Sequence, residues 1–132
     1  MRVLFDTNVL FAAFTVRGFC QELVEETVAL VTIIWSPALQ KELVAALRKK
    51  DLLSKAALAA AASFAALCEM HPPVVLPKRV SRDRDDDIVL GVAVAGRANV
   101  IITGDNDLLV VKKYERVRIM SPRQFLELLH SQ

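Results

Sequence analysis

Short apolar runs alternate along the chain with segments in which apolar residues recur every three or four positions. The apolar and β-branched runs predict strands at Arg2–Phe5, Val31–Trp35, Val74–Leu76, Val100–Thr103 and Val117–Ile119. Helical spacing predicts helices at Asn8–Phe14, Phe19–Leu30, Pro37–Lys49, Ser54–Met70, Asp86–Gly96 and Phe125–Leu129. Because strands alternate with helices, we predict an α/β fold, a three-layer α/β/α sandwich with a central, mainly parallel sheet. No linker or repeat is evident, so residues 1–132 form one predicted domain.

Local signals at the helix starts support this outline. Ser36-Pro37 and Ser121-Pro122 each place a serine N-cap before a proline at the first helical position. The segment Asp86–Gly96 is apolar nearly all round, which predicts a central, buried helix. The alanine-rich run Ala56–Ala66 favours a closely packed helix, with a dimer or partner surface as the alternative.

The composition favours a folded domain with a large core. The 132 residues are 54% hydrophobic and 24% charged, which excludes a disordered chain. A formal net charge of +2 is too small to indicate a nucleic-acid partner by itself. The cations nevertheless gather in three clusters, which either line a phosphate-binding rim or form solvated faces: Arg48-Lys49-Lys50; Lys78, Arg79, Arg82 and Arg84; and Lys112, Lys113, Arg116 and Arg118.

Cysteine usage and hydropathy predict a soluble, cytoplasmic protein. Cys20 and Cys68 fit no metal-ligand spacing, so we expect reduced core thiols. The chain shows no basic-then-apolar leader, because Asp6 interrupts the first apolar run. The longest uncharged stretches are too short to cross a bilayer, so we expect no membrane association.

Two carboxylates follow predicted strands directly. Asp6 ends the Arg2–Phe5 run, and Asp105 follows Val100–Thr103. Each alone could be an N-cap or part of an Asx turn. In a parallel sheet, however, both strands end at the same edge, where α/β proteins build their sites. The pair therefore predicts an acidic cluster at that edge.

Further acids lie on the predicted helices. Glu42 falls on the flank of the apolar stripe of its helix, where a carboxylate borders the core and needs a partner. Asp83 and Asp85 to Asp87 crowd the start of the buried helix, where the helix dipole favours acids. Asp86 shares a helical face with Leu90, but an all-apolar helix cannot decide between Asp86 and Asp87 by periodicity.

Carboxylates that meet at one sheet edge repel one another and raise each other's pKa values. A divalent cation resolves this conflict, and oxygen-only ligands without Cys or a well-placed His select Mg²⁺ or Mn²⁺. Such a site activates water and stabilises charge on a phosphodiester during in-line attack.

These motifs together resemble the PIN-domain nucleases, especially the toxin subunits of bacterial and archaeal toxin–antitoxin pairs. The resemblance runs over nearly the whole chain and rests on Leu4-Phe5-Asp6-Thr7-Asn8-Val9-Leu10, on Ser36-Pro37 before Lys41-Glu42-Leu43, on Asp86 before Val89-Leu90, and on Thr103-Gly104-Asp105-Asn106-Asp107-Leu108-Leu109. It implies a Mg²⁺- or Mn²⁺-dependent ribonuclease that hydrolyses RNA phosphodiester bonds and leaves 5′-phosphate and 3′-hydroxyl ends. It also implies a homodimer and a cognate antitoxin partner.

The resemblance assigns roles residue by residue. Asp6, Glu42, Asp86 and Asp105 match the acidic quartet that binds metal and carries catalysis. It implies that Asn8 and Thr103 orient carboxylates or water, and that Asp107 is an auxiliary ligand. The family often has Asn and Lys after the third acid, where this chain has Asp87-Ile88, so Asp87 stays a contender for the place of Asp86.

Two alternatives differ in function. A PIN-like module could bind RNA or protein without cutting, although an intact quartet argues against this. A haloacid-dehalogenase-type phosphatase would also use Asp6, Ser36 and Gly104-Asp105, but that chemistry requires a second acid where this chain has Asn8.

Overall fold

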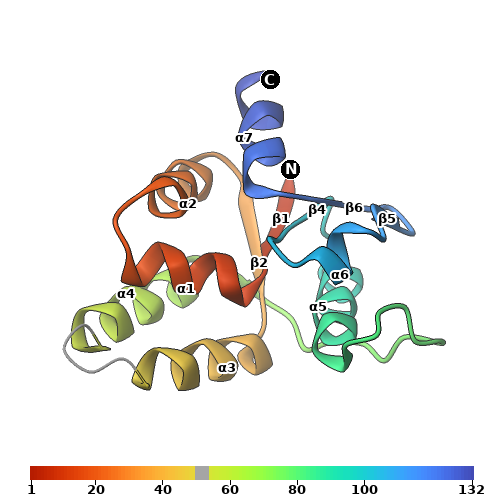
Figure 1. The fold of residues 1–132 in the computed structure, drawn as a ribbon, viewed down its shortest axis with the longest axis horizontal. Coiled ribbons are helices and arrows are strands. Elements are labelled where there is room, and N and C mark those ends of the chain that lie inside the picture. The colour runs from red at the N-terminus through yellow and green to blue at the C-terminus, as the bar shows by residue number, and fades with distance from the viewer. Residues whose placement is uncertain (50–53) are drawn as a thin grey trace.

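The computed structural model describes residues 1–49 and 54–132, which form one six-stranded sheet between helices (Figure 1). The strands are β1 (Arg2–Phe5), β2 (Thr32–Trp35), β3 (Glu69–Met70), β4 (Val100–Ile102), β5 (Lys113–Tyr114) and β6 (Val117–Met120). The helices are α1 (Thr7–Thr15), α2 (Phe19–Leu30), α3 (Pro37–Arg48), α4 (Ser54–Leu67), α5 (Arg84–Ala95), α6 (Asn106–Leu109) and α7 (Pro122–His130). None of the helices in these ranges is long and apolar enough to cross a membrane.

The sheet is mainly parallel, as predicted. Its strand order is β3-β2-β1-β4-β6-β5, and β5 is antiparallel to its neighbour β6. The first strand, β1, lies between β2 and β4, with Val3 aligned to Ile33 on one side and to Val100 on the other. The carboxyl ends of β1 and β4 therefore adjoin, and the Asp6 amide donates to the Ile102 carbonyl at 2.8 Å. This register positions the candidate site.

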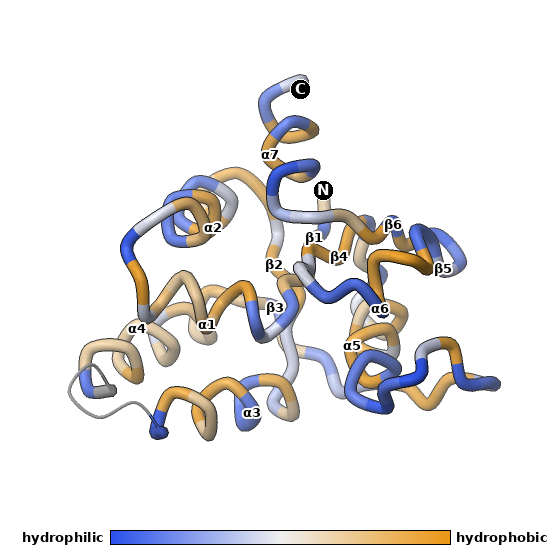
Figure 2. The backbone as a smooth tube through the Cα atoms, viewed as in Figure 1, coloured by the Kyte–Doolittle hydropathy of each residue, from blue (hydrophilic) through white to orange (hydrophobic). Residues whose placement is uncertain are grey.

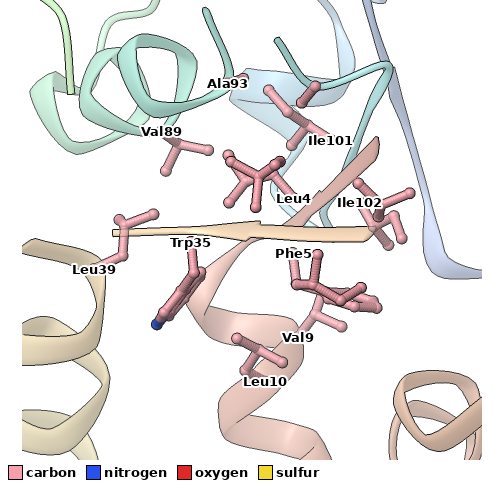
Figure 3. Close-up of a cluster of buried hydrophobic side chains, with 14 of the residues drawn as sticks. Leu4, Phe5, Val9, Leu10, Trp35, Leu39, Val89, Ala93, Ile101 and Ile102 are labelled. Atoms are coloured by element: carbon pink, nitrogen blue, oxygen red, sulfur yellow. The ribbon is translucent and has the colours of Figure 1, made fainter. Parts of the chain in front are cut away.

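Helices cover both faces of the sheet, which confirms the three-layer sandwich. Figure 3 shows Val89 and Ala93 of α5 on one side of β2, with Trp35, Phe5 and Leu10 on the other. Val3, Leu4 and Phe5 of β1 are buried on both faces of the sheet, as expected for a parallel strand between two helical layers. Orange, apolar residues accordingly follow β4 and most of α5, whereas the tube around β5 is mostly blue (Figure 2).

An aromatic cluster fixes α4 against the sheet. Phe64 makes edge-to-face contacts with Trp35 and Phe14, each at 5.8 Å between ring centroids. The alanine-rich helix buries Ala57 and Ala61 on the same side as Phe64 and exposes its opposite face. Close packing through alanine is thus confirmed for one face of α4.

The predicted strand at Val74–Leu76 is wrong. The edge strand is Glu69–Met70, so the preceding helix ends at Leu67 instead of Met70. Beyond it, Pro72-Pro73 cannot donate backbone hydrogen bonds to a sheet, and Val74 donates to the Gly91 carbonyl of α5 at 3.2 Å. A Cβ at Gly91 would lie 2.3 Å from the Val74 carbonyl oxygen, so this close approach requires glycine.

Other differences concern short elements and helix ends. The helix α6 and the strand β5 are absent from the prediction, whereas β6 was predicted as Val117–Ile119. The buried helix starts at Arg84 instead of Asp86, because the Asp83 side chain caps it by accepting from the Asp85 amide at 2.9 Å. It is central and largely buried as predicted, although Ile88 is exposed.

Both cysteines are free and half-buried. Burial raises the pKa of Cys20 and raises that of Cys68 to about 12, which disfavours the reactive thiolate. They are reduced thiols packed at the border of the core, as predicted.

Candidate metal centre

A cavity of about 220 Å³ lies where the carboxyl ends of β1 and β4 meet the starts of α1, α3 and α5. In Figure 1 this region lies between the α1 and α3 ends on one side and α5 and α6 on the other. All four acids of the predicted quartet line it, although they are spread over nearly a hundred positions of sequence. The lining residues are Asp6, Asn8, Glu42, Asp83, Asp85, Asp86, Val89 and Asp105.

Asp6 is held in the cavity by a side chain from the neighbouring strand. It occupies the N-cap position of α1, but its side chain makes no capping hydrogen bond. Instead, its Oδ2 accepts from the Thr103 hydroxyl at 2.7 Å, and it is 7% exposed. Burial raises the pKa of Asp6, and the hydrogen bond from Thr103, followed by contacts with the backbone amides of Thr7 and Asn8, offsets only part of this effect. The strongest hydrogen bond to the carboxylate therefore comes from Thr103, beside the end of β4.

Thr103 links the two strand-end acids. Its hydroxyl oxygen also accepts from the Asp105 amide at 3.0 Å. Asp105 does cap the short helix α6, because its Oδ1 accepts from the Asp107 amide at 2.9 Å. Capping occupies one carboxylate oxygen, and Asp105 still lines the cavity. Asp105 therefore both caps α6 and belongs to the acidic cluster.

The structure separates Asp86 from Asp87. Asp86 lines the cavity, is 4% exposed and accepts from the Ser81 hydroxyl at 2.8 Å. Burial, followed by the adjacent Asp105 carboxylate, raises the pKa of Asp86 to about 7. Asp87 does not line this cavity; its carboxylate accepts from the backbone amides of Val80 and Ser81 at 3.2 and 2.9 Å. Of the two, Asp86 faces the other acids.

Glu42 reaches the cavity from α3, with its outer side exposed to solvent. Partial desolvation at the cavity wall and the charges of Asp85 and Asp6 raise its pKa. The buried Thr7 hydroxyl is near enough to favour the charged form of Glu42. However, this hydroxyl makes no hydrogen bond of normal geometry. Every other buried side-chain polar atom in the described ranges has a hydrogen-bond partner.

Asp107 lies beside the cavity instead of lining it. Asp86, Asp105 and Asp107 each have one carboxylate oxygen that lies within 4.8 Å of the corresponding oxygens of the other two. Asp107 also accepts from Arg82 Nη2 at 2.9 Å. Among the described residues, Asp6 and Glu42 belong to no group of three acids with oxygens this close together.

The prediction did not include Ser81 or Thr7, and it expected at least two of the four acids at the start of the buried helix to serve only the helix dipole and capping. Asp83 is indeed the N-cap of α5, but Asp83 and Asp85 also line the cavity. Thr7 directly follows Asp6 at the same sheet edge, and this adjacency is the signal that could have identified it. The charged loop gave no comparable signal for Ser81, because its hydrogen bond to Asp86 depends on the loop path.

The residues present fit a divalent cation. The cavity gathers carboxylate oxygens from separate elements, and burial and mutual repulsion raise the pKa values of Asp6, Glu42 and Asp86. The Thr7 hydroxyl, close to Glu42, makes no hydrogen bond of normal geometry within residues 1–49 and 54–132. An oxygen-only donor set suits a hard cation better than Zn²⁺. The acidic cluster can therefore bind a metal ion.

Comparison with known families assigns the chain. The family model described as PIN domain matches residues 2–107, a range that contains all the acids described above. The chain belongs to the PIN-domain family. PIN domains are generally nucleases and usually use divalent metals. The family assignment thus favours the nuclease interpretation over the phosphatase alternative.

A solved structure has the same fold as this PIN domain. The crystal structure of VapBC2 from Rickettsia felis bound to a DNA fragment from their promoter includes a chain with a TM-score of 0.64. The two chains are 14% identical, and the similarity covers 92% of this chain and 98% of the other. At this identity the likeness concerns the fold alone. A comparison with curated proteins gives no match.

Proposed function

We propose that this PIN domain is a Mg²⁺- or Mn²⁺-dependent endoribonuclease that hydrolyses RNA phosphodiester bonds. One observation carries the proposal: the quartet Asp6, Glu42, Asp86 and Asp105 shares a single cavity within a PIN domain. A nuclease needs a site that binds cations and faces solvent, because the phosphodiester must reach it from outside. A cavity bordered by the exposed residues Asn8 and Glu42 meets this requirement.

The four acids of the quartet would hold the metal, with Asp107 as an auxiliary oxygen donor. When bound, the cation supplies a water of lowered pKa and stabilises negative charge on the phosphate. Thr103 fixes the orientation of Asp6, and Ser81 fixes that of Asp86. Asn8, exposed at the first turn of α1, is placed to hydrogen-bond an incoming water or substrate oxygen.

Asp87 has a supporting role in this proposal. Its carboxylate binds the backbone of Val80 and Ser81, so it fixes the segment from which the Ser81 hydroxyl reaches Asp86. Precise placement of a ligand by its hydrogen-bond partner is a general requirement of metal sites. Asp87 therefore acts through Ser81 and Asp86, without being a ligand itself.

The biological role that fits best is the toxin of a toxin–antitoxin pair, acting in the cytoplasm as a homodimer with a cognate antitoxin. Support comes from the motifs shared with PIN-domain toxins and from the fold shared with a chain of the VapBC2 structure. This role is independent of the chemistry: the nuclease proposal stands on the acidic cavity, whether or not an antitoxin exists.

The decisive test is the cleavage of defined single-stranded RNAs with Mg²⁺ or Mn²⁺, comparing the wild type with Asp6→Asn and Asp105→Asn. We expect each substitution to lower the rate by at least roughly a hundredfold, more than loss of a ligand's hydrogen-bond partner typically costs. The matched control is Glu115→Gln, which removes an exposed carboxylate from the β5–β6 hairpin. EDTA should abolish wild-type activity.

Two other outcomes are informative. If wild type and both Asn variants cleave equally well, the proposed site is wrong. If none cleaves although Mn²⁺ raises the melting temperature of wild type but not of Asp6→Asn, the cavity binds metal in a module that does not cut RNA.

A further inference from the structure

The second basic cluster lies beside the acidic cavity. Its residue Arg82 donates from Nη2 to the Asp107 carboxylate at 2.9 Å. An Asp107 oxygen lies within 4.8 Å of oxygens from Asp86 and Asp105, so the guanidinium stands at the rim of the acidic cluster. From the sequence alone, the basic cluster of Lys78, Arg79, Arg82 and Arg84 could be either a phosphate-binding rim or a solvated face.

The backbone that carries Arg82 is fixed, although it belongs to no helix or strand. Arg79 donates from Nη2 to the Arg82 carbonyl at 2.7 Å, and Asp87 accepts from the Ser81 amide at 2.9 Å. On the cavity side, the Ser81 hydroxyl binds Asp86 at 2.8 Å. Residues 79–82 are therefore held by one contact within the segment and by two contacts with the start of α5, next to which they lie (Figure 1). Such fixation reduces the entropy lost when the segment binds a ligand.

The guanidinium of Arg82 retains most of its hydrogen-bonding capacity. Its side chain is 89% exposed, and its one side-chain hydrogen bond to the described residues uses a single nitrogen. Arginine has five N–H donors in a planar fork that matches two phosphate oxygens. Because an exposed ion pair stabilises little, contact with Asp107 does not prevent Arg82 from binding a phosphate.

The negative charge of the cavity suggests a function for Arg82. Six carboxylates line the cavity, and they repel an RNA backbone that approaches from solvent. A cation fixed at the rim lowers this repulsion where it is strongest. We propose that Arg82 binds a backbone phosphate of the RNA next to the scissile bond, and that Arg79 and Asp87 hold it in place. This inference rests on the proposed function and names the residue that receives the substrate.

The test compares Arg82→Gln and Arg82→Lys with the control Arg116→Gln. Arg116 is also exposed. It directly precedes β6, so it lies at the amino-terminal end of this strand, whereas the cavity lies at the carboxyl ends of β1 and β4. Binding of a fluorescent single-stranded RNA is measured by anisotropy with Ca²⁺ over a series of salt concentrations, and cleavage is measured separately with Mg²⁺. For Arg82→Gln we expect roughly tenfold weaker binding and a salt slope smaller by about 0.7, the value for one phosphate of a single strand.

The conservative variant and a stability measurement separate phosphate binding from a structural role. Arg82→Lys keeps the charge and should restore the salt slope with part of the affinity. Arg82→Gln should leave the melting temperature of the protein unchanged, whereas loss of a structural ion pair would lower it. In cleavage, Arg82→Gln should raise KM more than it lowers kcat.

Each outcome decides the question. Wild-type affinity and salt slope in Arg82→Gln would overturn the inference while leaving the nuclease proposal intact. If wild type binds RNA without cleaving it, and Arg82→Gln binds weakly, the contact is upheld and the nuclease proposal fails. If wild type neither binds nor cleaves RNA, both are overturned.

Discussion

Asp86→Asn should stabilise the metal-free protein at alkaline pH. The folded protein raises the pKa of Asp86 from 3.8 to about 7, so its ionised form is disfavoured relative to the unfolded chain. A difference of about 3 in pKa corresponds to about 4 kcal/mol. Because the cavity opens to solvent and Asp105 shares the interaction, we expect about half of this, about 2 kcal/mol. Asparagine has the same shape and can still accept from Ser81.

The pH dependence has a defined sign. The folded-state pKa of this acid is raised, so the destabilisation is complete above about pH 7 and disappears as the pH falls towards 3.8. Asp86→Asn should therefore exceed wild type in stability at pH 8 and lose this advantage near pH 4. With Mg²⁺ or Mn²⁺ the order should reverse, because only wild type gains the full binding energy.

The assay is urea unfolding in EDTA at pH 8 and at pH 4, repeated at pH 8 with Mn²⁺. The matched control is Asp87→Asn, which should destabilise the protein at pH 8, because its carboxylate accepts backbone amide hydrogen bonds. A metal-free Asp86→Asn protein that is less stable than wild type at pH 8 would refute the reasoning.

Two more predictions concern single contacts. Thr103→Val removes the hydroxyl that joins Asp6 to the Asp105 amide; RNA cleavage should fall roughly 10- to 100-fold. The circular dichroism spectrum should be unchanged, and full activity would show that the link is dispensable. Gly91→Ala places a Cβ 2.3 Å from the Val74 carbonyl oxygen, which should cost about 1–3 kcal/mol in urea unfolding despite the better helix propensity of alanine. Equal or higher stability of this variant would contradict the close packing of Val74 on α5.

The acidic cavity was predictable in its outline because β-strand ends obey a simple rule. Asp6 and Asp105 each follow an apolar run, and parallel strands bring such residues to one edge. The choice between Asp86 and Asp87 was not predictable. It depends on two backbone amides of a preceding loop, which have no periodic signature in sequence.

Short elements escaped prediction for a related reason. The strands β3 and β5 contain two residues each, too few to show an alternating pattern. Val74–Leu76 has the composition of a strand, but Pro72-Pro73 and the contact with Gly91 direct it along α5. Its Val75 is 95% exposed, which no rule based on hydrophobicity anticipates.

The cavity is assembled from two parts with different kinds of support. Asp6 and Asp105 follow the adjoining strands β1 and β4, which are joined by main-chain hydrogen bonds, whereas residues 79–82 are fixed mainly by side chains. The strand part tolerates little change, because it is continuous with the core. We expect the segment 77–82 to tolerate changes of sequence better, provided that the contacts of Ser81 with Asp86 and Asp87 are kept. Substitutions in this segment are therefore the most direct way to change the substrate preference of the protein without disturbing the core.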